Sequence, residues 1–349
     1  MESDVTGDAR AQDRSGSGRW AAENSAPDPG APGTNDQGAD DAAQARCRHY
    51  GEFYGLSPLP APDGRRLVVL WGNCQAEAVR RLLQESPTRA VRSVRLPPVH
   101  ELTAEDLPHV ARVLSHADVL LAQPVADGYR DLPLGTAQVA RLLPPHGQVV
   151  QWPVLFDAAL YPFQVLVRHP SAGDPPLVPY HDLRTLLEAA TSRRPAARAP
   201  AQVYVELARR SVEALATRER HHDTVAVSPE LTRRTCEDFH TINHPGNRML
   251  VAAARALQRA LGLPVDAVDP RTREPGRILL GSVLTPQEPE VFAALGLEPA
   301  PGRDAWLVGG ERLADANVRA AHLGFYRRYP GFVDEGLRRH AETIRALQL

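Results

Sequence analysis

The fold is decided by a short stretch that reads Leu67-Val68-Val69-Leu70-Trp71-Gly72-Asn73-Cys74-Gln75. Five large apolar residues in succession are typical of a strand that is buried on both faces, as in a parallel sheet. Gly72 and Asn73 then turn the chain toward residues 75–84, where apolar side chains recur at helical spacing. A buried strand followed by a tight turn and a helix is the repeating unit of α/β folds.

The same alternation continues on the carboxyl side of this stretch. A helix is expected over residues 104–114, because Thr103 and Asp106 fit a capping box. Further strands are expected over residues 91–96, 117–122 and 148–152, and further helices over residues 181–190, 201–220, 246–261, 313–326 and 332–347. Gly262 is in the position expected for the end of a helix. The sequence therefore predicts an α/β fold with a mostly parallel sheet, flanking helices, and additional helical middle and C-terminal regions.

Residues 1–46 differ in composition from the rest of the chain. They hold nine acidic and four basic residues and almost no large apolar side chains. Such a segment buries too little apolar surface to offset the entropy lost on ordering, so we expect a disordered tail. We expect residues 47–349 to form a single α/β catalytic domain.

The composition excludes several classes of protein. The 40 basic and 42 acidic residues nearly cancel, which argues against a nucleic-acid-binding protein. All of the basic residues are arginines, so no lysine is present to form a Schiff base. No apolar run reaches the roughly 18 residues that a membrane helix requires, and the acidic N-terminus is unlike a signal peptide. Only three cysteines occur. We therefore expect a cytoplasmic protein without a membrane span.

Cys74 is the first candidate for chemistry. It follows the strand directly and should lie at the N-terminus of the next helix, where the unpaired N–H groups and the helix dipole stabilise a thiolate. The same N–H groups are suited to stabilising an oxyanion. The geometry is similar to the nucleophile elbow of hydrolases, with sulfur in place of oxygen. The alternative is a small buried cysteine that only packs behind the strand.

His244 is the second candidate. A histidine before a proline favours an extended conformation, so His244 should lie in a loop that enters the helix after Gly246. That position suits a general base, with Asn243 or a carboxylate such as Asp238 orienting the ring. The alternative is a histidine that hydrogen-bonds within its own loop. Cys236, His240 and His244 recur every four residues, but Pro245 argues against a continuous helix, so no metal site is expected.

These two segments together resemble the WcbI family of polysaccharide biosynthesis proteins. The resemblance rests on Gly72-Asn73-Cys74-Gln75 after an apolar strand and on Asn243-His244-Pro245 before an amphipathic helix. Gln123, residues 151–163 and Tyr180-His181 are similar to the middle of the family. The similarity covers about residues 67–262 and leaves out the first 46 residues and the region from about 265 to 349, which we expect to be a helical extension.

The resemblance implies a coenzyme A-binding acetyltransferase that modifies sugars. On that basis Cys74 is the nucleophile or central thiol, His244 is its base, and Asn243 belongs to the catalytic group. The implied coenzyme-binding residues are Gly72, Asn73, Gln75, Arg80, Gln123 and Arg248. Tyr161, Tyr180 and His181 are suited to lining a sugar pocket. Because the chain has no lysine, the phosphates of acetyl-CoA must be bound by arginines and helix N-termini.

Two other functions fit the same residues. An esterase or thioesterase would use water in place of the sugar, and the turn at Cys74 is similar to that of SGNH hydrolases except that cysteine replaces serine. A protein that is not an enzyme could bind coenzyme A, or sense redox state, through Cys74. The acetyltransferase is the leading interpretation, because cysteine in place of serine weakens the hydrolase alternative. The sequence leaves open the identity of the sugar.

Overall fold

The computed structural model describes residues 36–349 except 168, 170–171, 196–198 and 273–275. The chain packs into two compact units. The first consists of the residues up to 154 together with 218–227 and 250–277, and the second consists of 155–217, 228–249 and 278–349. The chain therefore passes from one unit to the other five times. The strands of each unit pair with one another and build that unit's own sheets.

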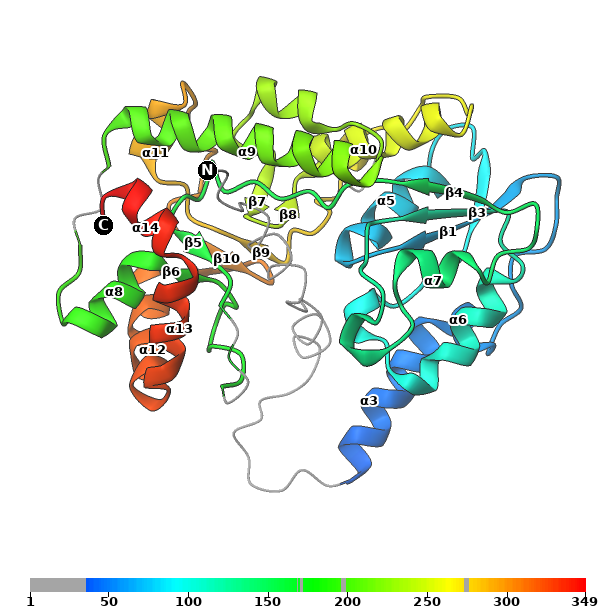
Figure 1. Ribbon diagram of the computed structural model, residues 1–349, viewed down its shortest axis with the longest axis horizontal. Helices are drawn as coiled ribbons and strands as arrows, with labels where there is room; N and C mark the ends of the chain where they lie inside the picture. Colours follow the sequence, from blue (N-terminus) through cyan, green and yellow to red (C-terminus); the bar gives the residue numbers. More distant parts are fainter. Residues whose placement is uncertain (1–35, 168, 170–171, 196–198, 273–275) are drawn as a thin grey trace, which may run out of the picture. The chain divides into compact units, whose positions relative to one another are not determined.

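The first unit is built on a parallel four-stranded sheet with the strand order β2-β1-β3-β4. Its strands β1, β3 and β4 lie side by side in Figure 1. Its strands are β1 (Arg66–Trp71), β2 (Val91–Ser93), β3 (Val119–Ala122) and β4 (Gln148–Gln151). Its helices are α3 (Asp36–His49), α4 (Gly51–Tyr54), α5 (Cys74–Gln84), α6 (Leu107–Leu114) and α7 (Thr136–Ala140). This arrangement confirms the predicted α/β fold.

Both faces of β1 are buried. Leu67, Val69 and Trp71 join one apolar core with side chains of α6 and α7. Val68 and Leu70, which point to the opposite face of the sheet, are also buried. The sequence has a continuous apolar run here because both faces of β1 are buried, as was predicted.

The strand order creates a switch point in the sheet. The chain leaves β1 toward β2 on one side and then crosses to β3 on the other side. In open α/β sheets, ligands bind at the carboxyl ends of the strands where the strand order reverses in this way. In this unit, that place lies where β1 ends at Trp71 and β3 ends at Ala122.

Among its described residues, the second unit contains three small antiparallel sheets and most of the C-terminal helices. Its strands are β5 (Gln164–Val165), β6 (His181–Asp182), β7 (Phe239–Thr241), β8 (His244–Pro245), β9 (Val283–Leu284), β10 (Trp306–Val308) and β11 (Glu311–Leu313). Its helices are α8 (Leu183–Thr191), α11 (Pro289–Ala294), α12 (Asp315–Arg328), α13 (Pro330–Arg339) and α14 (Ala341–Leu347). The terminal helices were predicted, whereas the sheet β11-β10-β9 was not.

Each of two longer helices, α9 (Ala201–His222) and α10 (Asn247–Ala260), contains residues of both units. Both were predicted within a few residues. Gly262, just after α10, has a φ of +65°, the left-handed conformation in which glycine commonly follows a helix. Among the described residues, no helix is both long and apolar enough to cross a bilayer.

Two expectations about helix boundaries were wrong. Residues 36–46 were assigned to the disordered tail, but they belong to α3. The end of that helix is held by Arg46, which donates to the carbonyl of Glu101 at 3.1 Å and lies 3.5 Å from a carboxylate oxygen of Asp106. His181 was expected in a helix, but it lies in β6. The helix begins only after Asp182, whose side chain accepts hydrogen bonds from the first backbone N–H groups of α8. Residues 1–35 lie outside the described part of the chain.

Candidate functional site

The turn after β1 places Cys74 as predicted, as the first residue of α5. Asn73 is the N-cap residue, and its side-chain oxygen accepts a hydrogen bond of 2.9 Å from the backbone N–H of Gln75. Cys74 is partly exposed. The thiol therefore lies at the positive end of an 11-residue helix and at the switch point of the parallel sheet.

Gln123 fixes this turn from the neighbouring strand. Its side-chain oxygen accepts from the backbone N–H of Asn73 at 2.9 Å, and its side-chain nitrogen donates to Gln75 Oε1 at 3.1 Å. Both glutamines are buried. Gly72 is required because a Cβ atom there would lie 2.3 Å from Gln123 Oε1. Gly72, Gln75 and Gln123 were predicted to bind the coenzyme; in the structure their visible role is to shape the turn that carries Cys74.

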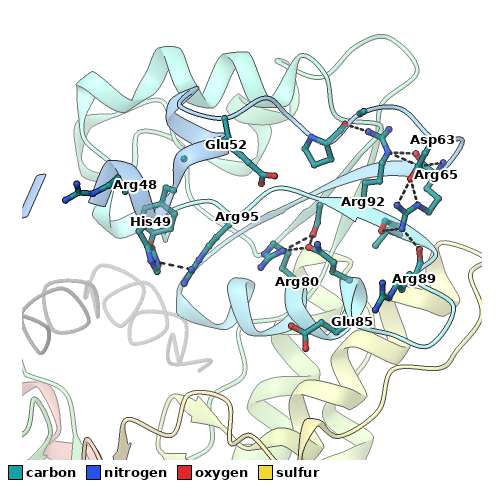
Figure 2. A pocket seen from close by; sticks show the side chains of 18 residues that line it. Arg48, His49, Glu52, Asp63, Arg65, Arg80, Glu85, Arg89, Arg92 and Arg95 are labelled. Carbon is teal, nitrogen blue, oxygen red and sulfur yellow. Dashed lines mark hydrogen bonds and ion pairs between the residues drawn. The ribbon is translucent and has the colours of Figure 1, made fainter. Parts of the chain in front are cut away.

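A hollow of about 890 Å³ lies along the second half of α5 in the same unit (Figure 2). The charged side chains that line it include six arginines and three carboxylates, namely Arg48, Arg65, Arg80, Arg89, Arg92, Arg95, Glu52, Asp63 and Glu85. Arg80 was predicted as a coenzyme-binding residue. Its guanidinium bonds to Glu77 and also lies 3.1 Å from Ser93 Oγ. The other arginines were not predicted, because their gathering depends on the pairing of β1 with β2.

His244 is placed by a hydrogen-bonded loop of the second unit. Its backbone N–H donates to Thr241 Oγ1 at 3.1 Å. Thr241 Oγ1 also donates to the hydroxyl of Tyr180 at 2.9 Å, and that hydroxyl donates to Asn243 Oδ1 at 2.7 Å. The ring of Tyr180 packs edge-on against the imidazole of His244, with 6.1 Å between the ring centroids. The structure therefore brings together three of the predicted site residues, Tyr180, Asn243 and His244.

The imidazole of His244 is shielded although the residue as a whole is only half-buried. Its Nδ1 has no hydrogen-bond partner among the residues that the structure describes. Burial lowers the pKa of His244 from 6.5 to about 4, because a charged imidazolium is poorly solvated there. The ring is therefore neutral at neutral pH and able to accept a proton.

Other predicted residues of the second unit have clear structural partners. The side chain of Arg248 donates to the buried carboxylate of Asp238 through Nε at 2.6 Å and through Nη2 at 2.5 Å. Asp238 also accepts from the backbone N–H and the hydroxyl of Thr235, so it is not available to orient His244. The charge of Arg248 is offset by Asp238 and by Glu230, which argues against its predicted role in binding phosphate.

Tyr161 and His181 both line a second hollow, which lies in the second unit. The hydroxyl of Tyr161 donates to the carbonyl of Phe239 at 2.8 Å. Cys236 lies before β7, His240 lies within it, and His244 lies in β8; the three residues therefore do not share a helix. Among the described residues, no group of three histidine, cysteine or acidic side chains is arranged to hold a metal ion.

His181 also belongs to a buried histidine cluster. Its Nδ1 is 2.6 Å from the hydroxyl of Tyr326, and its ring centroid is 5.3 Å from that of His322. His322 Nε2 is 3.1 Å from the carbonyl of Pro176. Burial lowers the pKa of His181 well below 6.5, and the nearby His322 and His340 lower it further. Burial also lowers the pKa of His322.

We expect these histidines to destabilise the protein in acid. Below about pH 6.5 the unfolded chain binds protons that the folded His181, His322 and His244 exclude, so the free energy of unfolding should fall as the pH falls. For His244, a pKa of about 4 against 6.5 corresponds to about 3 kcal/mol below pH 4, of which about 2 kcal/mol is already lost at pH 5. Urea unfolding at pH 7.5, 6.0 and 5.0 measures the loss. His181→Gln should reduce it, whereas His146→Gln, a change at an exposed histidine, should not. Equal midpoints at the three pH values would refute this account.

The fold and the turn define a class, an α/β protein with a cysteine at the switch point of a parallel sheet. The family model for the polysaccharide biosynthesis enzyme WcbI matches residues 67–266, which is more than half of the chain. The chain therefore belongs to the WcbI family, as the sequence motifs had indicated.

A comparison with solved structures agrees with this assignment. One match, at a TM-score of 0.67, is the structure of WcbI, described as a novel polysaccharide biosynthesis enzyme in a native form without a disulfide bond between coenzyme A and one of its cysteines. The two chains are 19% identical, and the alignment covers 81% of this chain and 98% of the other. The likeness confirms the fold. No curated protein matches the chain.

Proposed function

We propose that this protein transfers an acyl group, acetyl in the simplest case, from a coenzyme A thioester to a sugar hydroxyl. The observation that carries the proposal is the position of Cys74 at a helix N-terminus and a sheet switch point. The family's role in polysaccharide biosynthesis supports a sugar acceptor. The structural relative is described with reference to coenzyme A and one of its cysteines, which supports a coenzyme A thioester as the donor.

In the proposed reaction, Cys74 is the nucleophile and His244 moves the protons. Cys74 gives its proton to His244 as its sulfur attacks the thioester carbon, the bond from that carbon to the coenzyme sulfur breaks, and the departing sulfur takes that proton from His244. The oxyanion formed on the way is stabilised by N–H groups at the start of α5. His244 then accepts the proton of the sugar hydroxyl as its oxygen attacks the acyl carbon, and the Cys74 thiolate leaves. In the simpler variant His244 activates the hydroxyl for direct transfer and Cys74 only positions the donor.

Intact-mass measurement after mixing the protein with acetyl-CoA separates the two routes. A covalent route predicts a mass increase of one acetyl group that disappears in Cys74→Ser and decays when a sugar acceptor is added. Direct transfer predicts turnover without that species. Rapid release of acetate in the absence of sugar would favour the thioesterase alternative and refute the transferase.

We further propose that the arginine-lined hollow beside α5 binds the phosphates of the coenzyme. Arg80 lies six residues after Cys74, which is about 9 Å along a helix axis. An extended donor could therefore present its thioester to Cys74 and its phosphates to this hollow. Four of the six arginines pair with Glu77 or Asp63. In the described part of the chain no ion pair involves Arg48 or Arg89, so these two are best suited to such a polyanion. Arg48 and Arg89 are exposed there.

This arrangement makes coenzyme binding sensitive to salt. We expect the affinity for coenzyme A, measured by calorimetry, to fall about tenfold between 50 and 500 mM NaCl, because exposed charge contacts are screened. Replacing both arginines in Arg48→Gln/Arg89→Gln should weaken binding at low salt and flatten the salt dependence. Arg141→Gln, a change at an exposed arginine that is not among those lining the hollow, is the control. A salt-independent affinity would mean that uncharged contacts dominate.

A further inference from the structure

The hollow of the second unit differs in chemistry from the one beside α5. It has a volume of about 450 Å³ and is lined by both aromatic and charged side chains. The aromatic residues are Tyr161, Phe163 and Trp306, and all three are buried. Aromatic rings beside a few charged groups are typical of sites that bind small polar ligands in one orientation. Much of the lining comes from residues 285–315, which lie outside the region matched by the family model.

The carboxylates of this hollow already have partners. Asp182 and Glu288 both accept from Arg184. Asp315 accepts from the indole N–H of Trp306 at 3.0 Å. Asp304, at the exposed rim, pairs with Arg312.

Arg303 differs from the other charged side chains of this hollow in the kind of partners that it has. It is only 6% exposed, and its Nη2 donates to the Tyr161 hydroxyl at 2.9 Å and to the carbonyl of Thr285 at 2.7 Å. Both of these partners are uncharged. Within the described part of the chain, its Nε has no hydrogen-bond partner, and no carboxylate forms an ion pair with Arg303. A buried guanidinium without an anion is costly, and an anionic ligand in the hollow would offset that cost.

We propose that this hollow binds a sugar that carries a carboxylate, with Arg303 as its anion-recognising residue. The inference rests on the proposed function, since it names the class of acceptor. A single buried guanidinium matches one carboxylate, whereas the several phosphates of a coenzyme would meet the four carboxylates of this hollow. The sugar ring would pack against the aromatic lining. Its hydroxyls would donate to the carboxylate of Asp315, of which only one oxygen accepts a hydrogen bond among the described residues.

The test measures binding of uronic acids to the full chain without coenzyme. The probes are D-glucuronate and D-galacturonate, with D-glucose and D-galactose as their uncharged counterparts, followed by ligand-observed NMR titration. We expect each uronate to bind at least about tenfold more tightly than its neutral counterpart. Arg303→Gln should remove this preference, and Arg303→Lys should retain part of it. A thermal melt of each variant checks that it is folded.

A second variant keeps the test decisive if Arg303→Gln does not fold. The side chain of Asp304 is 75% exposed and pairs only across the rim with Arg312, so Asp304→Asn should fold normally. Removing this negative charge should strengthen uronate binding by about two- to fivefold and leave neutral sugars unaffected. Asp334→Asn, the same change at another exposed position of the second unit, is the control.

Two outcomes would overturn the proposal. Uronates and neutral sugars could bind equally well, in which case Arg303 serves only the fold. Alternatively, 3′,5′-ADP could displace the uronate, in which case the hollow belongs to the coenzyme. Because no transfer occurs in this assay, uronate binding that persists in Cys74→Ser protein, together with a failed acetyl-transfer assay, would reject the proposed function and leave this inference standing.

Discussion

Replacing His244 by alanine should reduce acetyl transfer by about a hundredfold or more, the usual scale for the loss of a general base. The low pKa of the shielded imidazole keeps it neutral at neutral pH, which is the form that a general base must have. Steady-state turnover with acetyl-CoA measures the effect. Coenzyme A affinity should change little, because the proposed role of His244 is confined to proton transfer. His146→Ala, at an exposed histidine of the first unit, should retain full activity.

The reactivity of the Cys74 thiol is an independent test of whether Cys74 and His244 act together. Iodoacetamide should alkylate Cys74 faster than Cys47 or Cys236 near neutral pH, because only Cys74 begins a helix. Burial raises the pKa of Cys236, which slows its reaction further. His244→Ala should slow alkylation of Cys74 if the imidazole acts on the thiol. Near-normal turnover and unchanged alkylation would show that the pairing is wrong, and His181 or His240 would then be the next base to test.

Replacing Gly72 by alanine should both destabilise the first unit and abolish activity. The new Cβ would lie within 3 Å of three side-chain atoms of Gln123. Gln123 can move only by breaking its buried hydrogen bonds to Asn73 and Gln75, each of which costs about 1–3 kcal/mol. For a unit of this size we expect the melting temperature to fall by roughly 5–15 °C. Differential scanning calorimetry measures the shift.

A double substitution tests the cause of that effect. In a Gln123→Ala background the clash is gone, so Gly72→Ala should cost much less than it does alone. Gly173→Ala is the control, because a Cβ there would meet open space without a left-handed backbone. Additive costs for Gly72→Ala and Gln123→Ala would contradict the proposed contact.

Local signals of the sequence predicted the first unit well. The apolar run Leu67–Trp71 indicated a strand buried on both faces, and these residues are all buried in β1. The pair Thr103 and Asp106 indicated a helix start, and the Asp106 carboxylate does accept from the Thr103 backbone N–H at 3.0 Å. Cys74 at a helix N-terminus followed from the same local rules. Such features are predictable because the interacting groups are close in the sequence.

What could not be predicted depends on partners that are distant in the sequence. The strands β9, β10 and β11 have only two or three residues each, so their sheet is specified by pairing rather than by periodicity. No feature of the neighbouring sequence indicated that Arg248 would form an ion pair with Asp238. Arg303 stands in a proline-rich stretch without any signal of its burial. In contrast, the start of α8 could have been placed correctly, since Asp182 is a typical N-cap residue.

The five passages of the chain between its two units affect how the protein is made. The first unit needs residues 250–277, so it cannot be completed until the ribosome has passed them. By then, segments 155–217 and 228–249 of the second unit have already emerged, and that unit waits for residues 278–349. At synthesis rates of about 5–20 residues per second, unfinished parts of both units are exposed together for several seconds or more. No continuous fragment of the chain contains either unit alone, so neither unit can be expressed separately as one uninterrupted segment.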